Sequence, residues 1–203
     1  MNSFLICGLI AFAVSAVAMP VVVSVSRSLG AISEIGGRHV GMRPIGRLGG
    51  IGVLLGIVVA IAIQNCLDPL VNSAWHQDER RILGLTFGLA LVAITGFWDD
   101  IRRLRATQKL MAQVVAALIC YSFGLRISGV ELPVFGPIQL GWFGLPITVF
   151  WIVGIVNAVN LIDGLDGLAG GVLLFASVVN FMAAIGSGAM ISATLMVAVW
   201  DCC

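Results

Sequence analysis

Two aspartates, Asp163 and Asp166, and two asparagines, Asn157 and Asn160, lie in the segment N-A-V-N-L-I-D-G-L-D-G-L-A-G-G, residues 157–171. The aspartates stand three residues apart and would share one face of a helical turn. Uncharged apolar sequence flanks the segment, and acids beside membrane-length apolar runs usually mark an ion, substrate or proton site because they are costly in lipid. The alternative is a solvated turn between two helices, since Asp-Gly pairs are common turn signals.

A second acidic pair, Asp99-Asp100, ends an apolar run and is followed by three arginines and Lys109. Adjacent carboxylates repel each other, so a metal ion or cationic neighbours must compensate if both are ionised. Oxygen ligands of this kind suit Mg²⁺, which commonly takes one or two carboxylates together with substrate phosphates. The alternative is a helix end at which the arginines act as simple counter-charges.

Two further arginines, Arg43 and Arg47, lie in the turn R-P-I-G-R-L-G-G, which opens an apolar run. Arginine is a good phosphate ligand, and backbone amides at a helix N-terminus add favourable partial charge for an anion. A juxtamembrane basic cluster that only fixes orientation is an equal alternative. The turn therefore predicts a phosphate contact only in combination with the acidic segments.

The composition bounds the class of protein. Hydrophobic residues make up 60% of the 203 residues and charged residues 10%, and the mean hydropathy is +1.09. These values are typical of a polytopic membrane protein. The net charge of +1 argues against a nucleic-acid partner. The five cysteines lie mostly inside apolar runs without C-x-x-C spacing, so we expect buried apolar residues with neither a disulfide framework nor a zinc site.

We expect an all-α polytopic membrane protein whose residues 1–203 form one integral-membrane domain. A helix needs about 20 apolar residues to cross a hydrocarbon core of about 30 Å. We therefore expect six complete transmembrane helices and an incomplete seventh. A short periplasmic hairpin is expected near residues 127–144, where prolines and glycines break helices. A cleavable signal peptide is the alternative for the first span, although no basic region precedes it. The expected spans are residues 1–26, 48–67, 82–98, 110–125, 146–159 and 168–185, the incomplete one is 189–200, and a polar surface loop covers 68–81.

Successive spans alternate in direction, so the connections 27–47, 99–109 and 157–167 fall on one side of the membrane. That side holds eight of the eleven basic residues, and the positive-inside rule therefore makes it cytoplasmic and the N-terminus periplasmic. The acids, Lys109 and the arginine turn converge on this face. Such a set predicts a site for Mg²⁺ and phosphates, open to a water-soluble phosphate donor on one side and to lipid on the other.

Together these motifs resemble those of the polyprenyl-phosphate N-acetylhexosamine-1-phosphate transferase family, glycosyltransferase family 4. The run D-D-I-R-R-L-R-A-T-Q-K-L resembles the acidic pair and lysine of that family, and residues 157–171 resemble its most specific motif almost residue for residue. The turn R-P-I-G-R-L-G-G is similar to the branch that transfers N-acetylglucosamine-1-phosphate or a related amino-sugar phosphate.

The resemblance implies a Mg²⁺-dependent reaction, with Mn²⁺ as a substitute, at the bacterial inner membrane and at the start of cell-envelope polysaccharide synthesis, such as O-antigen or cell wall. Undecaprenyl phosphate attacks the β-phosphorus of a UDP-sugar, and UMP leaves. One carboxylate of the acidic pair serves as a candidate base. The implied catalytic and metal-binding residues are Asp99, Asp100, Asp163 and Asp166, and the implied substrate-binding residues are Arg43, Arg47, Lys109, Asn157 and Asn160.

The chain also departs from the family pattern. It lacks the further helices, the G-D-x-G-S-like segment and the histidine-rich cytoplasmic loop, and this is typical of a truncation or frameshift. A catalytically inactive truncated member stays open as an alternative, as does a small ion-coupled transporter. The acids cluster at one interface without a visible internal repeat, which weighs against the transporter. The UDP-sugar, the pathway and a homodimer stay undecided.

Overall fold

The computed structural model describes residues 2–28, 48–132, 136–162 and 168–200. In these ranges the chain forms α-helices, one short hairpin and one 3₁₀ turn. It divides into two compact units, residues 1–77 with 162–203 and residues 78–161. Each unit is described by itself below.

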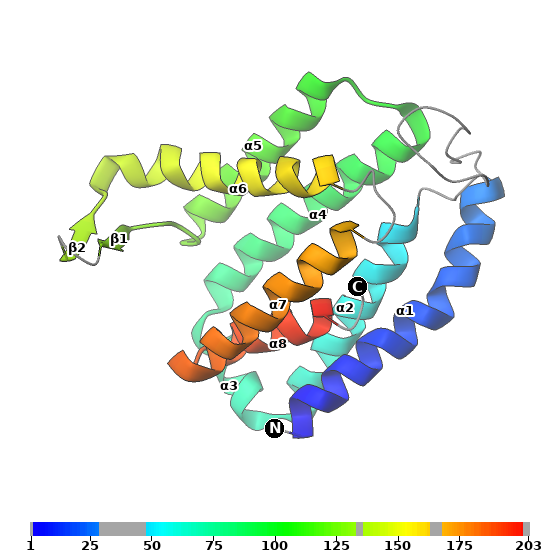
Figure 1. Ribbon diagram of the computed structural model, residues 1–203, viewed down its shortest axis with the longest axis horizontal. Coiled ribbons are helices and arrows are strands. Elements are labelled where there is room, and N and C mark those ends of the chain that lie inside the picture. The colour runs from blue at the N-terminus through cyan, green and yellow to red at the C-terminus, as the bar shows by residue number, and fades with distance from the viewer. Residues whose placement is uncertain (1, 29–47, 133–135, 163–167, 201–203) are drawn as a thin grey trace. The chain divides into compact units, whose positions relative to one another are not determined.

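The first unit is built on the pair α1 (Asn2–Ser28) and α2 (Gly49–Leu67), which lie side by side (Figure 1). Small residues allow this close approach, because Gly52, Gly56 and Ala60 follow one another at four-residue spacing on one face of α2. A Cβ atom on Gly56 would lie 2.7 Å from the backbone carbonyl oxygen of Ala11. Small-residue seams of this kind are typical of helices that pack in lipid, where no hydrophobic force drives helices together.

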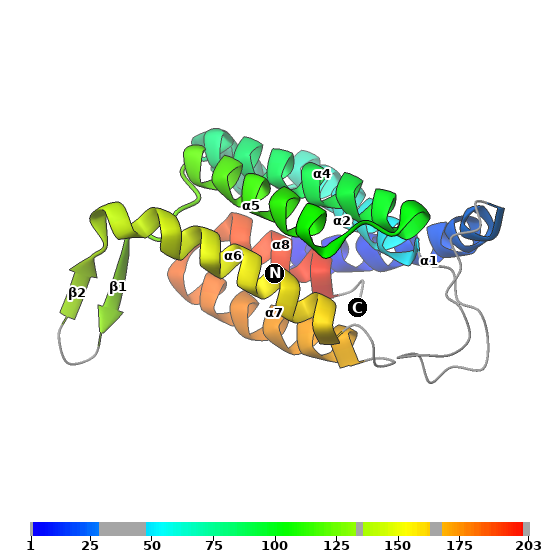
Figure 2. The same ribbon diagram turned by 90° about the horizontal axis from the view of Figure 1, so that it is seen from above.

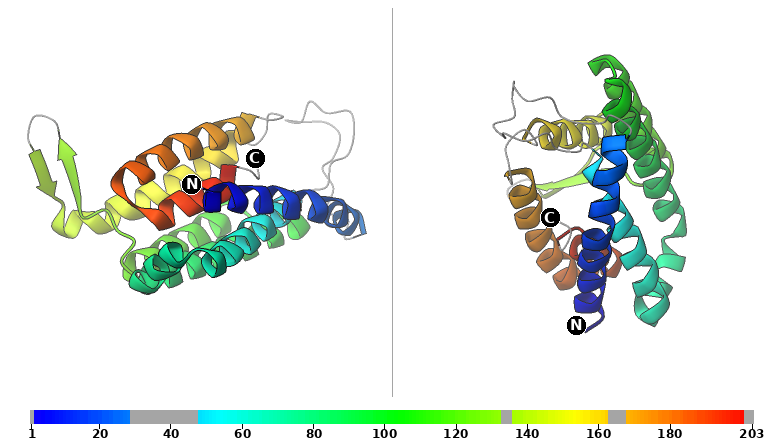
Figure 3. Two further views of the ribbon diagram at one scale, coloured as in Figure 1. Left: turned by 90° about the horizontal axis from the view of Figure 1, so that it is seen from below. Right: turned by 90° about the vertical axis from the view of Figure 1, so that its right-hand side faces the viewer.

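Two further helices, α7 (Leu168–Ser187) and α8 (Met190–Trp200), pack together, and α8 also packs on α1 (Figure 3). The buried core of this unit joins Cys7 of α1 and Ala60 of α2 to Val197 and Ala198 of α8. The aromatic ring of Phe4 meets that of Phe181 edge-on, with centroids 5.7 Å apart. Of the described cysteines, Cys7 and Cys120 are buried as expected, whereas Cys66 is exposed and does not fit the expectation of a buried apolar residue.

The expected polar loop at 68–81 is wrong, because residues Pro69–Gln77 form the helix α3 and the next helix begins at Glu79. Asp68 begins this helix: its Oδ1 accepts the backbone N–H of Leu70 at 3.0 Å. Proline suits the first helical position because it lacks an N–H that would need a partner there. The sequence carried this capping pattern, but a nine-residue helix with one buried apolar residue, Val71, has too weak a hydrophobic signal to predict.

The second unit contains α4 (Glu79–Arg102), α5 (Ala106–Ser122) and α6 (Gly144–Ile162), of which α4 and α5 run side by side (Figure 2). Two glycines on α4, Gly84 and Gly88, make room for this packing. A Cβ atom on Gly88 would lie 2.6 Å from the Sγ of Cys120, and one on Gly84 would collide with the side chain of Phe123. Arg80, near the start of α4, also bonds to the end of α5: its Nη2 donates to the carbonyl oxygen of Ser122 at 3.1 Å.

The expected hairpin is present between α5 and α6. Strand β1 (Gly129–Leu132) pairs antiparallel with β2 (Gly136–Gln139), and a 3₁₀ turn, η1 (Gly141–Phe143), leads into α6. The backbone N–H of Ile127 donates to Thr148 Oγ1 at 3.0 Å, and this hydroxyl donates to the carbonyl of Gly144. The segment that leads into the hairpin is therefore fastened to the start of α6.

Among the described residues, five helices are long and apolar enough to cross a membrane, namely those at Ser3–Ser28, Gly49–Leu67, Glu79–Arg102, Gly141–Ile162 and Leu168–Ser187. The 17 residues of α5 reach the lower limit for a crossing helix, and the 11 residues of α8 do not. Large apolar side chains point outward along these helices, as Phe150 does with 79% of its surface exposed. The expected all-α polytopic membrane protein is confirmed, and the expected incomplete seventh helix corresponds to α8, which is apolar but too short to cross a membrane.

Candidate active site

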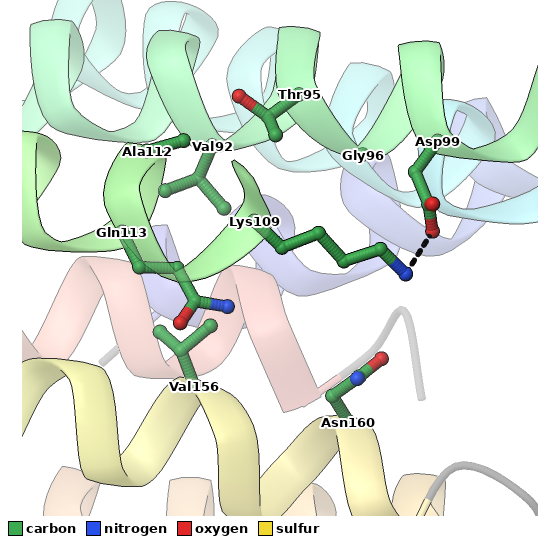
Figure 4. A pocket seen from close by; sticks show the side chains of 9 residues that line it. All are labelled: Val92, Thr95, Gly96, Asp99, Lys109, Ala112, Gln113, Val156 and Asn160. Carbon is green, nitrogen blue, oxygen red and sulfur yellow. Dashed lines mark ion pairs between the residues drawn. The ribbon is translucent and has the colours of Figure 1, made fainter. Parts of the chain in front are cut away.

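A cavity of about 140 Å³ lies within the second unit, between α4, α5 and α6 (Figure 4). Its walls are apolar along most of their length, and its polar groups come from all three helices. Asp99 and Thr95 come from α4, Lys109 and Gln113 from α5, and Asn160 from α6. The remaining lining residues are Val92, Gly96, Ala112 and Val156.

Asp99 is held by the turn that ends α4. The backbone N–H of Arg103 donates to the carbonyl oxygen of Asp99 at 2.8 Å, and Arg103 has a left-handed φ of +49°. A left-handed residue just after a helix is a common helix stop that returns the next N–H toward the last turn. Here that next group, the N–H of Leu104, donates to Asp99 Oδ1 at 2.8 Å. One carboxylate oxygen of Asp99 is therefore fixed by the backbone.

The other carboxylate oxygen of Asp99 pairs with Lys109. Lys109 Nζ lies 2.5 Å from Asp99 Oδ2, and Figure 4 shows the lysine side chain stretched across the cavity toward this aspartate. Lys109 stands in the first turn of α5, which begins where Gln108 Oε1 accepts the backbone N–H of Arg105 at 3.0 Å. The side chains of Lys109 and Asp99 keep 35% and 20% of their surfaces exposed, so water and a small anion can reach the pair.

The C-terminal half of α6 contributes two amides. Asn160 lines the cavity opposite the ion pair. Asn157 stands one turn earlier, where its Nδ2 donates to Gln113 Oε1 at 2.6 Å and to the carbonyl oxygen of Val153 at 2.8 Å. The two amides lie three residues apart and so share one face of α6.

The structure brings together three of the residues singled out from the sequence, Asp99, Lys109 and Asn160, around one cavity. Asp100 follows Asp99 in the last turn of α4, and Asn157 sits beside the cavity on α6. The other four expected site residues, Arg43, Arg47, Asp163 and Asp166, lie outside the described residues, so their roles stay predictions.

Sequence reasoning missed Gln113, which lines the cavity and bonds to Asn157. A signal was present, because Gln113 stands four residues after Lys109 and therefore on the same face of α5. The bond from the backbone N–H of Leu104 to Asp99 could not be predicted either, because no residue type marks an arginine that takes a left-handed backbone conformation.

Residues 82–203, more than half of the chain, match the sequence profile of glycosyl transferase family 4. The chain belongs to glycosyl transferase family 4. The resemblance drawn from the acidic segments is thereby confirmed, and the matched range contains the whole cavity.

The family 4 chain is similar to curated proteins of two kinds. It is 31% identical over 139 residues to a protein of Bacillus subtilis (strain 168) named probable undecaprenyl-phosphate N-acetylglucosaminyl 1-phosphate transferase, covering 68% of this chain and 36% of that protein. It is 31% identical over 175 residues to the phospho-N-acetylmuramoyl-pentapeptide-transferase of Streptococcus thermophilus (strain CNRZ 1066), covering 77% and 49%. The same enzyme name belongs to a Streptococcus equi subsp. zooepidemicus (strain MGCS10565) relative, which is 34% identical over 168 residues, covering 75% and 49%.

The family 4 chain thus spans from about a third to a half of the length of these relatives. The relatives include both the amino-sugar branch and the pentapeptide branch by name. Family membership and the apolar helices together make the chain a multi-pass membrane protein.

The polar groups of this family 4 site fit a hard divalent cation in their chemistry. Asp99 and Asn160 line the cavity with a carboxylate and an amide, Asp100 is the next residue of α4, and Mg²⁺ prefers such oxygens over nitrogen and sulfur. Within the described ranges there is no group of three or more His, Cys, Asp or Glu side chains that could hold a metal alone. Mg²⁺ commonly keeps waters and shares its shell with substrate phosphates, so one or two of these carboxylates suffice.

Proposed function

We propose that this chain acts in the transfer of a sugar-1-phosphate, N-acetylglucosamine-1-phosphate or a related amino-sugar phosphate, from a UDP-sugar to undecaprenyl phosphate. The observation that carries the proposal is the Asp99–Lys109 ion pair at a cavity of a family 4 membrane protein. A partly exposed lysine held in place by a carboxylate is a ready cationic ligand for a phosphate. The similarity to a probable undecaprenyl-phosphate N-acetylglucosaminyl 1-phosphate transferase supports the choice of sugar and acceptor.

The reaction balances as a phosphoryl transfer. An oxygen of the lipid phosphate bonds to the β-phosphorus of the UDP-sugar, the bond from this phosphorus to the bridging oxygen breaks, and UMP leaves with that oxygen. Catalysis of such a step consists mainly of positioning and neutralisation of charge. Mg²⁺, when bound, supplies further neutralisation of the phosphate oxygens.

The residues of the cavity divide these tasks. Lys109 neutralises a phosphate oxygen, and its position is set by Asp99, both of whose carboxylate oxygens are engaged in the described structure. Asn160 binds the sugar nucleotide from the opposite wall. Asp100, Asp163 and Asp166 are the proposed remaining ligands for the metal, while Arg43 and Arg47 are proposed for the phosphates.

The proposed setting is the bacterial inner membrane, with the site at the cytoplasmic face. The acceptor is a lipid and the donor is soluble in water, so a site at the end of transmembrane helices meets both. The C-terminal end of α4 and the N-terminal end of α5, which carry Asp99 and Lys109, are joined by Arg103, Leu104 and Arg105 at this boundary. Basic residues next to a transmembrane helix favour the cytoplasmic side.

The deciding experiment measures Mg²⁺-dependent release of UMP from UDP-N-acetylglucosamine by membranes that contain this chain and added undecaprenyl phosphate. Asp163→Asn is the inactivated variant, and Arg81→Met is the matched control, because it removes the exposed Arg81–Asp78 ion pair, 3.4 Å long, at the other end of α4. We expect release that Asp163→Asn abolishes and Arg81→Met leaves unchanged. Release equal to that of Asp163→Asn would mean that this chain does not catalyse the transfer.

A further inference from the structure

One hydrogen bond beside the cavity has no role in the reaction described above. The side chain of Gln113 on α5 meets that of Asn157 on α6, with Asn157 Nδ2 donating to Gln113 Oε1 at 2.6 Å. These residues lie 44 positions apart in the sequence, so the bond joins two helices rather than two turns of one helix. Gln113 also lines the cavity, one turn after Lys109.

The second bond of Asn157 fixes how its amide is turned. The same Nδ2 donates to the carbonyl oxygen of Val153 at 2.8 Å. A carbonyl oxygen can only accept, so the nitrogen of the Asn157 amide must face it. The partner atom of Gln113 must then be its oxygen, which leaves the Gln113 Nε2 group as a donor.

Both hydrogens of the Asn157 amide are therefore used within the protein, and its carbonyl oxygen has no partner among the described residues. An amide with this pattern can offer a ligand only an acceptor. The helix α5 offers hydrogen-bond donors instead, because Lys109 Nζ and Gln113 Nε2 both lie on the face that lines the cavity. Figure 4 shows these two side chains extending from α5 toward the cavity, with Asn160 on the facing helix.

We propose that Gln113 is a positioning residue, which holds the Asn157 amide so that its carbonyl oxygen accepts a hydrogen bond from a hydroxyl or imide N–H of the sugar nucleotide. The proposal rests on the proposed function, because it takes a nucleoside-diphosphate sugar as the ligand. Phosphates carry acceptors only, and thus belong beside Lys109. Asn157 instead selects the part of the ligand that carries donors, the nucleoside or the sugar.

The test is a double-mutant cycle of Gln113→Leu, Asn157→Leu and the doubly substituted chain. Leucine has the branching of asparagine and a size near that of glutamine, and it makes no hydrogen bond. Each single variant should raise the KM for UDP-N-acetylglucosamine about tenfold, with the KM for undecaprenyl phosphate unchanged, since one positioned hydrogen bond is lost. The double variant should be no worse than Asn157→Leu, because Gln113 acts only through Asn157.

Asn180→Leu on α7 is the matched control, because Asn180 Nδ2 donates to the carbonyl of Ala176 at 2.7 Å in the same four-residue pattern, far from the cavity in sequence. It should leave both KM values unchanged. The proposal would be overturned if the effects of the two single substitutions on this KM simply added in the double variant. It would also be overturned if Gln113→Leu had a KM for UDP-N-acetylglucosamine within twofold of the parent value. A merely structural role would lower the melting temperature and both substrate affinities together.

A second readout separates this inference from the proposed function. Equilibrium binding of UDP-N-acetylglucosamine to the detergent-solubilised chain is measured for the same variants. A parent that binds the nucleotide sugar without transferring it would refute the proposed function, while a coupled tenfold loss of binding would still support the role of Gln113. A parent that neither binds nor transfers would overturn both.

Discussion

Lys109 Nζ lies 2.5 Å from Asp99 Oδ2, while Asp99 Oδ1 accepts the backbone N–H of Leu104. The aspartate thus connects the end of one helix to the start of the next and aims the lysine at the cavity. Because both side chains are partly exposed, the pair adds little to stability.

Lys109→Met should therefore separate stability from activity. We expect the free energy of unfolding to change by less than about 1 kcal/mol, as for other exposed ion pairs. Transfer to undecaprenyl phosphate should fall about a hundredfold or more, because a charge aimed at the reacting phosphates is lost. Arg81→Met, which removes an ion pair outside the cavity, should change neither quantity. A Lys109→Met chain with parental turnover would rule out the phosphate role.

The α4–α5 seam predicts a stability effect of adding one methyl group. Gly84→Ala would place its Cβ against the Cβ of Phe123 and 3.0 Å from Cγ, so the helices must separate. Overpacking of this kind costs about 1–3 kcal/mol. Gly154→Ala on α6, whose Cβ would meet nothing within 4 Å, is the control. Thermal unfolding in detergent should show a lower midpoint for Gly84→Ala only, and equal midpoints would contradict the close approach.

Removal of divalent metal should abolish the reaction. Excess EDTA is expected to bring UMP release to the level of Asp163→Asn, and added Mg²⁺ should restore it, with Mn²⁺ as a substitute. Ca²⁺ is the informative control, because it prefers more ligands at longer distances than this small donor set offers. Turnover that persists in EDTA would show that cationic side chains alone neutralise the phosphates.

Asp68 predicts a pH dependence outside the membrane-spanning helices. The hydroxyl of Ser3 bonds to this carboxylate and lowers its pKa below 3.8, and the N–H groups of Leu70 and Val71 act in the same direction while partial burial opposes them. A lowered pKa stabilises the fold above pH 3.8, and this contribution is lost as the pH falls through the lowered value.

Asp68→Asn should thus melt at a lower temperature than the parent at pH 7, and the difference should shrink between about pH 4 and pH 2. Melting curves in detergent across this range provide the measurement. A difference that stays constant down to the lowest pH would show that the charge of Asp68 contributes nothing.

The orientation of the chain can be tested with single cysteines on either side of α4. In a chain without its native cysteines, Gln77→Cys and Thr107→Cys place exposed thiols before and after this helix. A membrane-impermeant maleimide added to cells with a permeable outer membrane should label position 77 but not 107, because basic residues favour the cytoplasm. Labelling of position 107 alone would reverse the proposed orientation of the site.

Much of this fold could be predicted because long apolar runs specify membrane helices directly. The expected span 82–98 corresponds to α4, which continues through its charged ends from Glu79 to Arg102. The helix α3 could not be predicted in this way, since it is nine residues long and buries a single apolar side chain, Val71.

The site was predictable in part for a different reason. Alternation of the spans places Asp99, Lys109 and Asn160 on one side of the membrane, and the structure brings them to one cavity. The bond between Gln113 and Asn157 depends on how α5 and α6 are rotated about their axes, and apolar periodicity is a poor guide when a helix is apolar on all sides.

The spacing of α4 and α5 changes along their length. A Cβ atom would collide with α5 at Gly84 and Gly88, whereas at Gly96, where the cavity lies, it would meet nothing within 4 Å. Asp99 stands about 16 Å beyond Gly88 along the helix, at about 1.5 Å per residue. We therefore expect a methyl group added at the glycine end to tilt the two helices apart and to shift the Asp99 carboxylate relative to Lys109. Substitutions at Gly84 or Gly88 would thus change the width of this site without replacing any residue that touches substrate.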